Sequence, residues 1–118
     1  MNEEEMKQRT RKFALRIIRF VESLPRGRTA DVIGKQLLRS GTSVGANYRA
    51  VCRAKSNADF ISKMSIVEEE ADESLYWIEL LVESGMVEIN KVKSLMEEAS
   101  ELVAIVVTSI KTAKTKRF

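Results

Sequence analysis

Five carboxylates within six consecutive positions are the residues of this chain best suited to catalytic chemistry. They are Glu68, Glu69, Glu70, Asp72 and Glu73. In a helix, Glu68 and Asp72 share one face and Glu69 and Glu73 share another, so each pair could hold a hard cation such as magnesium. Such a site needs further carboxylates from another element, and the first two predicted helices offer mainly Arg and Lys. We therefore favour salt bridges from this acidic stretch to the basic residues, and expect no metal site and no cofactor.

The absence of histidine narrows the chemistry further. It excludes a Ser-His-Asp catalytic triad, a Cys-His catalytic dyad, and the His-containing zinc and di-iron sites found in many helical bundles. The single cysteine, Cys52, cannot form an internal disulfide and is expected to be a buried, inert thiol. We expect a protein that is not an enzyme. A magnesium-dependent nuclease that uses Glu69 is the weakest alternative.

Basic residues give the better functional signal. They recur at spacings that place each set on one side of a helix. The first row is Arg9, Lys12, Arg16 and Arg19, and the second is Lys35, Arg39, Arg49 and Arg53. Guanidinium groups presented side by side suit a phosphate backbone. Salt bridges from the arginines of the second row to the acidic stretch are the alternative interpretation.

Charge is divided unevenly along the chain, whose net charge is +3. Residues 1–63 carry 14 Lys and Arg against 6 Asp and Glu, and residues 64–118 carry 6 against 11. The first half can therefore attract a polyanion that the second half repels. A basic tail of Lys111, Lys114, Lys116 and Arg117 could also touch a polyanion.

Hydrophobic periodicity predicts four helices, over about residues 3–24, 29–54, 57–84 and 88–112. Pro25 and Gly85 mark helix ends, Ser56 is a predicted cap, and Thr29 or Asp31 is expected to cap the second helix. One proline and five glycines are too few for an all-β chain. Long helices with short connections predict one domain, residues 1–118, with an all-α, antiparallel up-down-up-down four-helix bundle.

The second predicted helix carries Gly34, Gly41 and Gly45 on a narrow strip beside its apolar face. A glycine inside a helix costs about 0.5–1 kcal/mol relative to alanine. The strip therefore predicts that another backbone comes close. A loop over residues 41–43 and 45–47 is the alternative, but the apolar residues keep the same phase on both sides of the glycines. This favours a continuous or slightly kinked helix.

A polar seam of Gln36, Ser40, Ser43 and Asn47 lies between this apolar face and the basic row. For Ser43 and Asn47 we favour structural hydrogen bonds over contact with a ligand. Glu68 lies at the margin of the core stripe of the third helix, where Asn47 or Arg53 could be its partner.

Several apolar residues fall outside the predicted core stripes. They are Leu15 and Ile18 in the first helix, and Ile66, Trp77 and Leu80 in the third. Self-association is the simplest way to cover them, so they form the expected oligomer interface. No apolar run approaches the length of about 18 residues that a membrane span needs. We expect a soluble, cytoplasmic protein with neither a membrane nor a small-molecule substrate as partner.

A resemblance to a known family rests on residues 34–81, GKQLLRSGTSVGANYRAVCRAKSNADFISKMSIVEEEADESLYWIELL. The stretch resembles the four-helix bundle proteins encoded in intervening sequences of bacterial 23S ribosomal RNA genes, also called the S23 ribosomal protein family. The resemblance implies a left-handed bundle that forms a ring-like homo-oligomer, a pentamer, with a positively charged surface. The family is similar to the accessory variability protein of diversity-generating retroelements, which binds nucleic acid and a reverse transcriptase. In the matched stretch, the polar positions of interest are Arg39, Ser43, Asn47, Arg49 and Arg53.

These observations favour a non-enzymatic, homo-oligomeric bundle that binds nucleic acid through its basic helix faces with little sequence specificity. RNA is favoured over DNA. The alternative is a protein-interaction adaptor that docks a partner such as a reverse transcriptase or another nucleic-acid enzyme.

Overall fold

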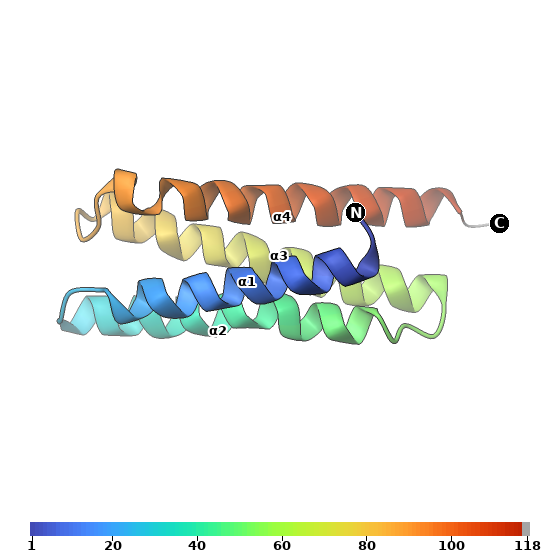
Figure 1. The fold of residues 1–118 in the computed structure, drawn as a ribbon, viewed down its shortest axis with the longest axis horizontal. Coiled ribbons are helices and arrows are strands. Elements are labelled where there is room, and N and C mark those ends of the chain that lie inside the picture. The colour runs from blue at the N-terminus through green and yellow to red at the C-terminus, as the bar shows by residue number, and fades with distance from the viewer. Residues whose placement is uncertain (117–118) are drawn as a thin grey trace.

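Four α-helices joined by short connections make up the computed structural model, which describes residues 1–116 (Figure 1). The helices are α1 (Glu3–Glu22), α2 (Arg28–Val51), α3 (Asn57–Glu83) and α4 (Ile89–Thr115). Consecutive helices run in opposite directions, and each packs beside the next along the chain (Figure 1). The predicted all-α four-helix bundle is confirmed: the first and third helices begin at the predicted residues, and the other helix ends differ from the predicted ones by one to three residues. Its left-handed twist stays a prediction.

Local sequence explains where most helices begin and end. The Asn2 side chain accepts a hydrogen bond from the Glu5 backbone N–H at 2.8 Å and starts α1. The predicted cap of α3 is confirmed, because Ser56 Oγ accepts from the Asp59 N–H at 3.0 Å. Gly85, with φ of +84°, follows α3 as predicted.

The predicted cap of α2 is wrong. The helix begins at Arg28, before both Thr29 and Asp31, and no side chain caps it. Gly27 precedes it with φ of +153°, a conformation that favours glycine, and reverses the chain close to the end of α1. Because the chain turns at Gly27, α2 begins at Arg28, one residue before Thr29 and three residues before Asp31.

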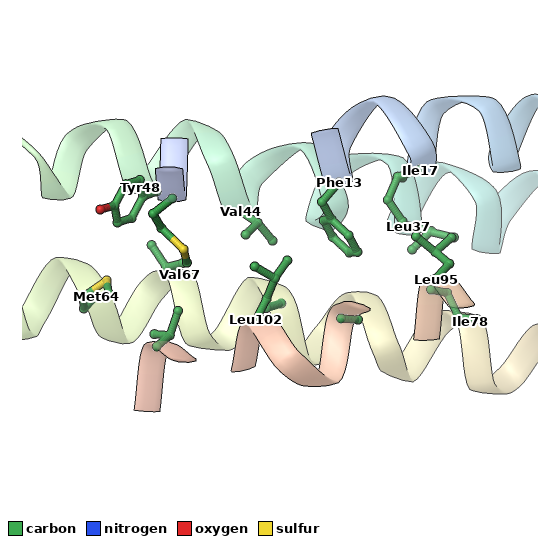
Figure 2. Close-up of a cluster of buried hydrophobic side chains, with 14 of the residues drawn as sticks. Phe13, Ile17, Leu37, Val44, Tyr48, Met64, Val67, Ile78, Leu95 and Leu102 are labelled. Carbon is green, nitrogen blue, oxygen red and sulfur yellow. The ribbon is translucent and has the colours of Figure 1, made fainter. Parts of the chain in front are cut away.

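One apolar stripe from each helix forms the core. Its largest fully buried side chains include Phe13, Ile17, Leu37, Ile78 and Leu102. Figure 2 shows side chains from α1 and α2 pointing toward those from α3 and α4. The pairs α1–α2, α2–α3 and α3–α4 pack extensively, whereas the contact between α1 and α4 is much smaller. Within residues 1–116, no helix combines the length and the apolar character required to cross a bilayer.

The glycine strip lies where α1 crosses α2, and α2 continues through it as a helix. A Cβ atom placed on Gly45 would lie 3.4 Å from the carbonyl carbon and oxygen of Thr10. A Cβ atom on Gly41 would lie 2.7 Å from Cγ1 of Ile17, whose side chain is fully buried. Both the continuous helix and the close approach of a second backbone are confirmed.

Substitution of Gly41 tests this packing. We expect Gly41→Ala to destabilise the fold by about 1–3 kcal/mol, because the new methyl group overpacks Ile17. Gly34→Ala is the matched control, since its Cβ meets the flexible end of Leu24 at 3.2 Å. There, the higher helix propensity of alanine should leave stability unchanged or raise it by up to about 1 kcal/mol. Urea denaturation, monitored by circular dichroism, measures the free energy of unfolding of both variants. Equal stabilities would contradict the tight contact between Gly41 and Ile17.

Candidate nucleic-acid interface

Three cations converge on a groove between α1 and α2. Lys7 and Arg11 reach it from α1, and Arg49 reaches it from the last turn of α2. Its volume is about 480 Å³, and the small residues Gly45 and Ala46 are among those that line it. Glu4 also lines it, and Glu3 pairs with Lys7 at 3.5 Å. Because Gly45 allows the two helices to approach closely, cations from separate helices can face the same ligand.

The predicted basic row of α1 divides between two roles. Arg9 makes a two-pronged ion pair with Glu98 of α4, with Nε–Oε2 and Nη2–Oε1 distances of 2.8 and 2.7 Å, and also reaches Glu101 at 3.1 Å. The hydrogen bonds to Glu98 raise the pKa of Arg9 above its usual value. Arg16 donates to Ser94 Oγ at 3.1 Å. Arg9 and Arg16 therefore tie α1 to α4.

The other two members of this row, Lys12 and Arg19, are exposed. Neither makes a hydrogen bond or ion pair with any other residue in the range 1–116. Both are therefore available for a ligand.

The predicted basic row of the second helix divides in the same way, and its last member, Arg53, lies beyond the end of α2 at Val51. Arg39 donates to both carboxylate oxygens of Glu70 at 3.2 Å and also pairs with Glu73. The salt-bridge interpretation is thus confirmed for Arg39. Lys35, Arg49 and Arg53 are exposed and have no ion pair with another described residue. For Arg49 and Arg53, the predicted alternative of salt bridges to α3 is therefore not formed.

Two carboxylates of the acidic stretch of α3, Glu70 and Glu73, make contacts inside the bundle. Trp77 Nε1 donates to Glu73 Oε2 at 2.9 Å, and this bond, together with the Arg39 contact, lowers the pKa of Glu73. Within the described part of the chain, no group of three or more Asp, Glu, Cys or His side chains could hold a metal ion. The structure thus uses part of the acidic stretch to hold α2 and α3 together.

The predicted partner of Glu68 is wrong. Neither Asn47 nor Arg53 forms a hydrogen bond or ion pair with it, because the Asn47 amide donates to the Ser43 carbonyl at 2.8 Å, within α2. Ser43 Oγ donates to the Arg39 carbonyl at 2.6 Å, also within the helix. Both Ser43 and Asn47 thus make the structural hydrogen bonds that were predicted.

One member of the polar seam bonds to a neighbouring helix. Ser40 and Ser74 are completely buried, and their Oγ atoms lie 3.0 Å apart across the α2–α3 contact. The Ser40 hydroxyl is within bonding distance of the Leu37 carbonyl, and that of Ser74 lies 2.8 Å from the Glu70 carbonyl. These bonds satisfy both hydroxyls inside the apolar core.

The residues predicted to form an oligomer interface lie at the surface to different degrees. Leu15, Ile18 and Ile66 are exposed by 45%, 40% and 44%. Trp77 and Leu80 are half-buried, and the Trp77 ring packs on the core and meets Tyr76 edge to face at 5.1 Å. Two helices, α1 and α3, therefore each present apolar side chains to solvent.

A second, larger opening lies at the end of the bundle where α2 meets α3. It has a volume of about 700 Å³ and is lined in part by Tyr48, Cys52 and Phe60. Burial raises the pKa of Tyr48 to about 12 and also raises that of the Cys52 thiol. Cys52 is half-buried just beyond α2, and its thiol stays protonated near neutral pH. This opening offers no activated nucleophile.

Sequence reasoning missed three cations of this surface, Lys7, Arg11 and Arg28. Arg11 lies in the groove with Arg49, and Arg28 is exposed at the start of α2. Arg28 precedes Lys35 by seven residues, a spacing that places both on one side of a helix. That spacing could have identified Arg28. Only the contact between α1 and α2 places Arg11 beside Arg49. Of the basic tail, Arg117 lies outside the described residues.

Charge is segregated on the folded protein as well as along the sequence. Helix α3 contains eight acidic residues and one lysine, whereas α1 and α2 together contain ten basic and five acidic residues. The chain is thus an antiparallel four-helix bundle with a basic α1–α2 side and an acidic third helix. Residues 2–108 match the model of the 23S rRNA-intervening sequence protein family, and the chain belongs to that family.

A solved structure supports the same assignment. The chain is similar to a protein of unknown function from the S23 ribosomal protein family of Bacteroides thetaiotaomicron, with 36% sequence identity and a TM-score of 0.86. The match covers 94% of this chain and 99% of that one. No curated protein matches the sequence.

Replacing Arg9 separates structural cations from available ones. We expect Arg9→Met to destabilise the fold by about 1–3 kcal/mol, because it leaves the mostly buried Glu98 carboxylate without its partner. Arg19→Met is the control on the same helix, and its effect should stay within about 0.5 kcal/mol. Thermal and urea denaturation measure both variants. If both variants lost the same amount of stability, the Arg9–Glu98 ion pair would not be a stabilising contact.

Trp77, the one tryptophan of the chain, reports on the protonation of Glu73. The folded protein lowers the pKa of Glu73 from 4.5, so its contribution to stability is complete above pH 4.5 and is lost as the pH falls through the lower, folded value. We expect a transition in Trp77 fluorescence with a midpoint below pH 4.5, and its disappearance in Glu73→Gln. Glu69→Gln should retain it. Circular dichroism recorded in parallel distinguishes this transition from unfolding, and its persistence in Glu73→Gln would contradict the assignment.

Proposed function

We propose that this protein is a non-enzymatic, homo-oligomeric helical bundle that binds nucleic acid through the α1–α2 side. The phosphate backbone is the main target, so sequence specificity is low. The observation that carries the proposal is the groove that Lys7, Arg11 and Arg49 share. Arg11 and Arg49 make no ion pair with another described residue, and Lys7 makes one ion pair at the surface, with Glu3 at 3.5 Å. Cations that are not neutralised internally can release counterions from a polyanion when they bind it.

Other cations extend this surface. Lys12 and Arg19 on α1, Lys35 on α2, and Arg53 just beyond the end of α2 are exposed and likewise without ionic partners in residues 1–116. Arg9, Arg16 and Arg39 make contacts inside the bundle and contribute less. The acidic α3 repels phosphates, which orients the ligand toward the α1–α2 side.

RNA is placed ahead of DNA because the description of the family refers to 23S rRNA. Phosphate contacts alone would not distinguish the two. The exposed cations support binding to nucleic acid of either kind, and family membership is the reason for proposing RNA.

Self-association strengthens a weak basic surface. One chain has a net charge of only +3, but several copies acting on one polyanion gain affinity through avidity. The exposed Leu15 and Ile18 on α1 and Ile66 on α3 are apolar surface that contact between copies would cover. We propose a ring-like assembly, for which the family resemblance implies a pentamer.

A second candidate function is a protein-interaction adaptor. It is favoured by α3, where Tyr76, 51% exposed, lies one turn from the half-buried Leu80, and where Ile66 is exposed further along the same helix. Aromatic and apolar residues surrounded by charge are typical of protein interfaces. A nucleic-acid enzyme such as a reverse transcriptase is the kind of partner we propose for this role.

Sedimentation of the purified protein, alone and with a labelled structured RNA, tests the main proposal. We expect a multimer that binds RNA at about 50 mM salt and loses at least about tenfold in affinity at about 200 mM, as phosphate-driven binding requires. Arg49→Glu and Arg11→Glu should each abolish binding at the higher salt while leaving helicity and assembly intact.

Lys93→Glu is the matched control, because it makes the same change of charge on α4, in a groove lined by Glu79, Glu97 and Glu101. It should bind RNA like the unmodified protein. If the multimer ignores RNA and DNA at both salt concentrations, the binding proposal is wrong and the adaptor is favoured. If Lys93→Glu weakens binding as much as Arg49→Glu, the ligand is not held on the α1–α2 side.

A further inference from the structure

The exposed cations of α2 follow a regular stripe. Arg28, Lys35 and Arg49 are separated by seven and fourteen residues, a pattern that drifts by only about 20° around the helix every seven residues. All three side chains are exposed. Lys7 and Arg11 of α1 join the stripe at the Arg49 end. The result is an elongated row of positive charge that winds by about 60° around α2 and has the uncharged Thr42 between Lys35 and Arg49, rather than a compact patch.

The length of this row matches a feature of double-stranded nucleic acid. A rise of about 1.5 Å per residue separates Arg28 from Arg49 by about 32 Å along the helix axis. One turn of B-form DNA is about 34 Å long, and a turn of an A-form RNA duplex is of comparable length. A rigid helix therefore places its outer cations at the distance at which phosphates on the same face of a duplex recur.

The same surface lacks the groups that bind unpaired bases. Proteins that hold single strands stack the bases on exposed aromatic side chains. The aromatic residues of α1 and α2 are Phe13, Phe20 and Tyr48, and all three pack in the core. Among residues 1–116, the one aromatic side chain with more than a third of its surface exposed is Tyr76, on the acidic helix α3.

We infer that the ligand of the α1–α2 surface is a double-helical nucleic acid, held by its phosphates, rather than a single strand. A duplex keeps its bases stacked internally and presents its phosphates as a regular array, so binding requires no aromatic partner. It also carries one negative charge per about 1.7 Å of its axis, which a row of cations can follow. This inference rests on the proposed function.

The experiment compares one RNA strand, chosen to be unstructured, with the same strand annealed to its complement to give a duplex of about 21 base pairs, longer than the row of cations. Fluorescence anisotropy at about 100 mM salt gives the affinity for each. We expect the duplex to bind about tenfold more tightly. Arg28→Glu and Arg49→Glu, at the two ends of the row, should each reduce duplex affinity by about tenfold or more and lower the salt slope by about one. Lys93→Glu should leave it unchanged.

The possible outcomes separate the inference from the proposed function. If strand and duplex bind equally, and Arg49→Glu weakens both, nucleic-acid binding stands and the duplex inference is overturned. If the strand binds more tightly and Tyr76→Ala removes the difference, bases stack on α3 and the inference is again overturned. If Arg28→Glu has no effect while Arg49→Glu does, the ligand occupies only the groove and does not follow the row. If neither RNA binds at any salt concentration, both proposals fail.

Discussion

The close approach of α1 and α2 is the constraint on which the rest of the structure depends. Gly41 and Gly45 remove the side chains that would keep the two helices apart, so Ile17 and the backbone of Thr10 pack directly on α2. This contact fixes the register of the two helices. It thereby decides that Arg11 faces the same groove as Arg49, and that Arg9 turns toward α4.

Basic residues on such a bundle have two possible uses, and the fold separates them. A cation at the flank of a helix can reach a carboxylate on the neighbouring helix, as Arg9 reaches Glu98 and Arg39 reaches Glu70. A cation on the outward side cannot, so its charge is available to an external ligand. The number of Lys and Arg residues therefore overestimates how many cations can bind a polyanion, because some are paired inside the bundle. The net charge of the chain underestimates it, because it subtracts the acidic residues of α3.

Much of the fold follows from sequence patterns that act over short distances. The apolar periodicity, the Ser56 cap and the phase of residues on both sides of Gly41 lie within single helices, and these predictions are confirmed. The partners of Glu68, Arg49 and Arg53 depend on rotation and register between helices. A shift of one residue moves a side chain by about 100° around a helix, enough to exchange a neighbouring helix for solvent. Sequence spacing alone cannot fix such partners.

The order in which the helices pack also bears on how the chain reaches its fold. Every extensive contact joins helices that are consecutive in sequence, and only α1–α4 joins distant ones. A contact between consecutive helices closes only a short loop, so it costs little conformational entropy. Chains with mostly local contacts of this kind fold fast. The seam between α1 and α4 carries the largest loop-closure cost and has the least packing to offset it. The Arg9–Glu98 pair would then form late in folding, as the contact that closes the bundle.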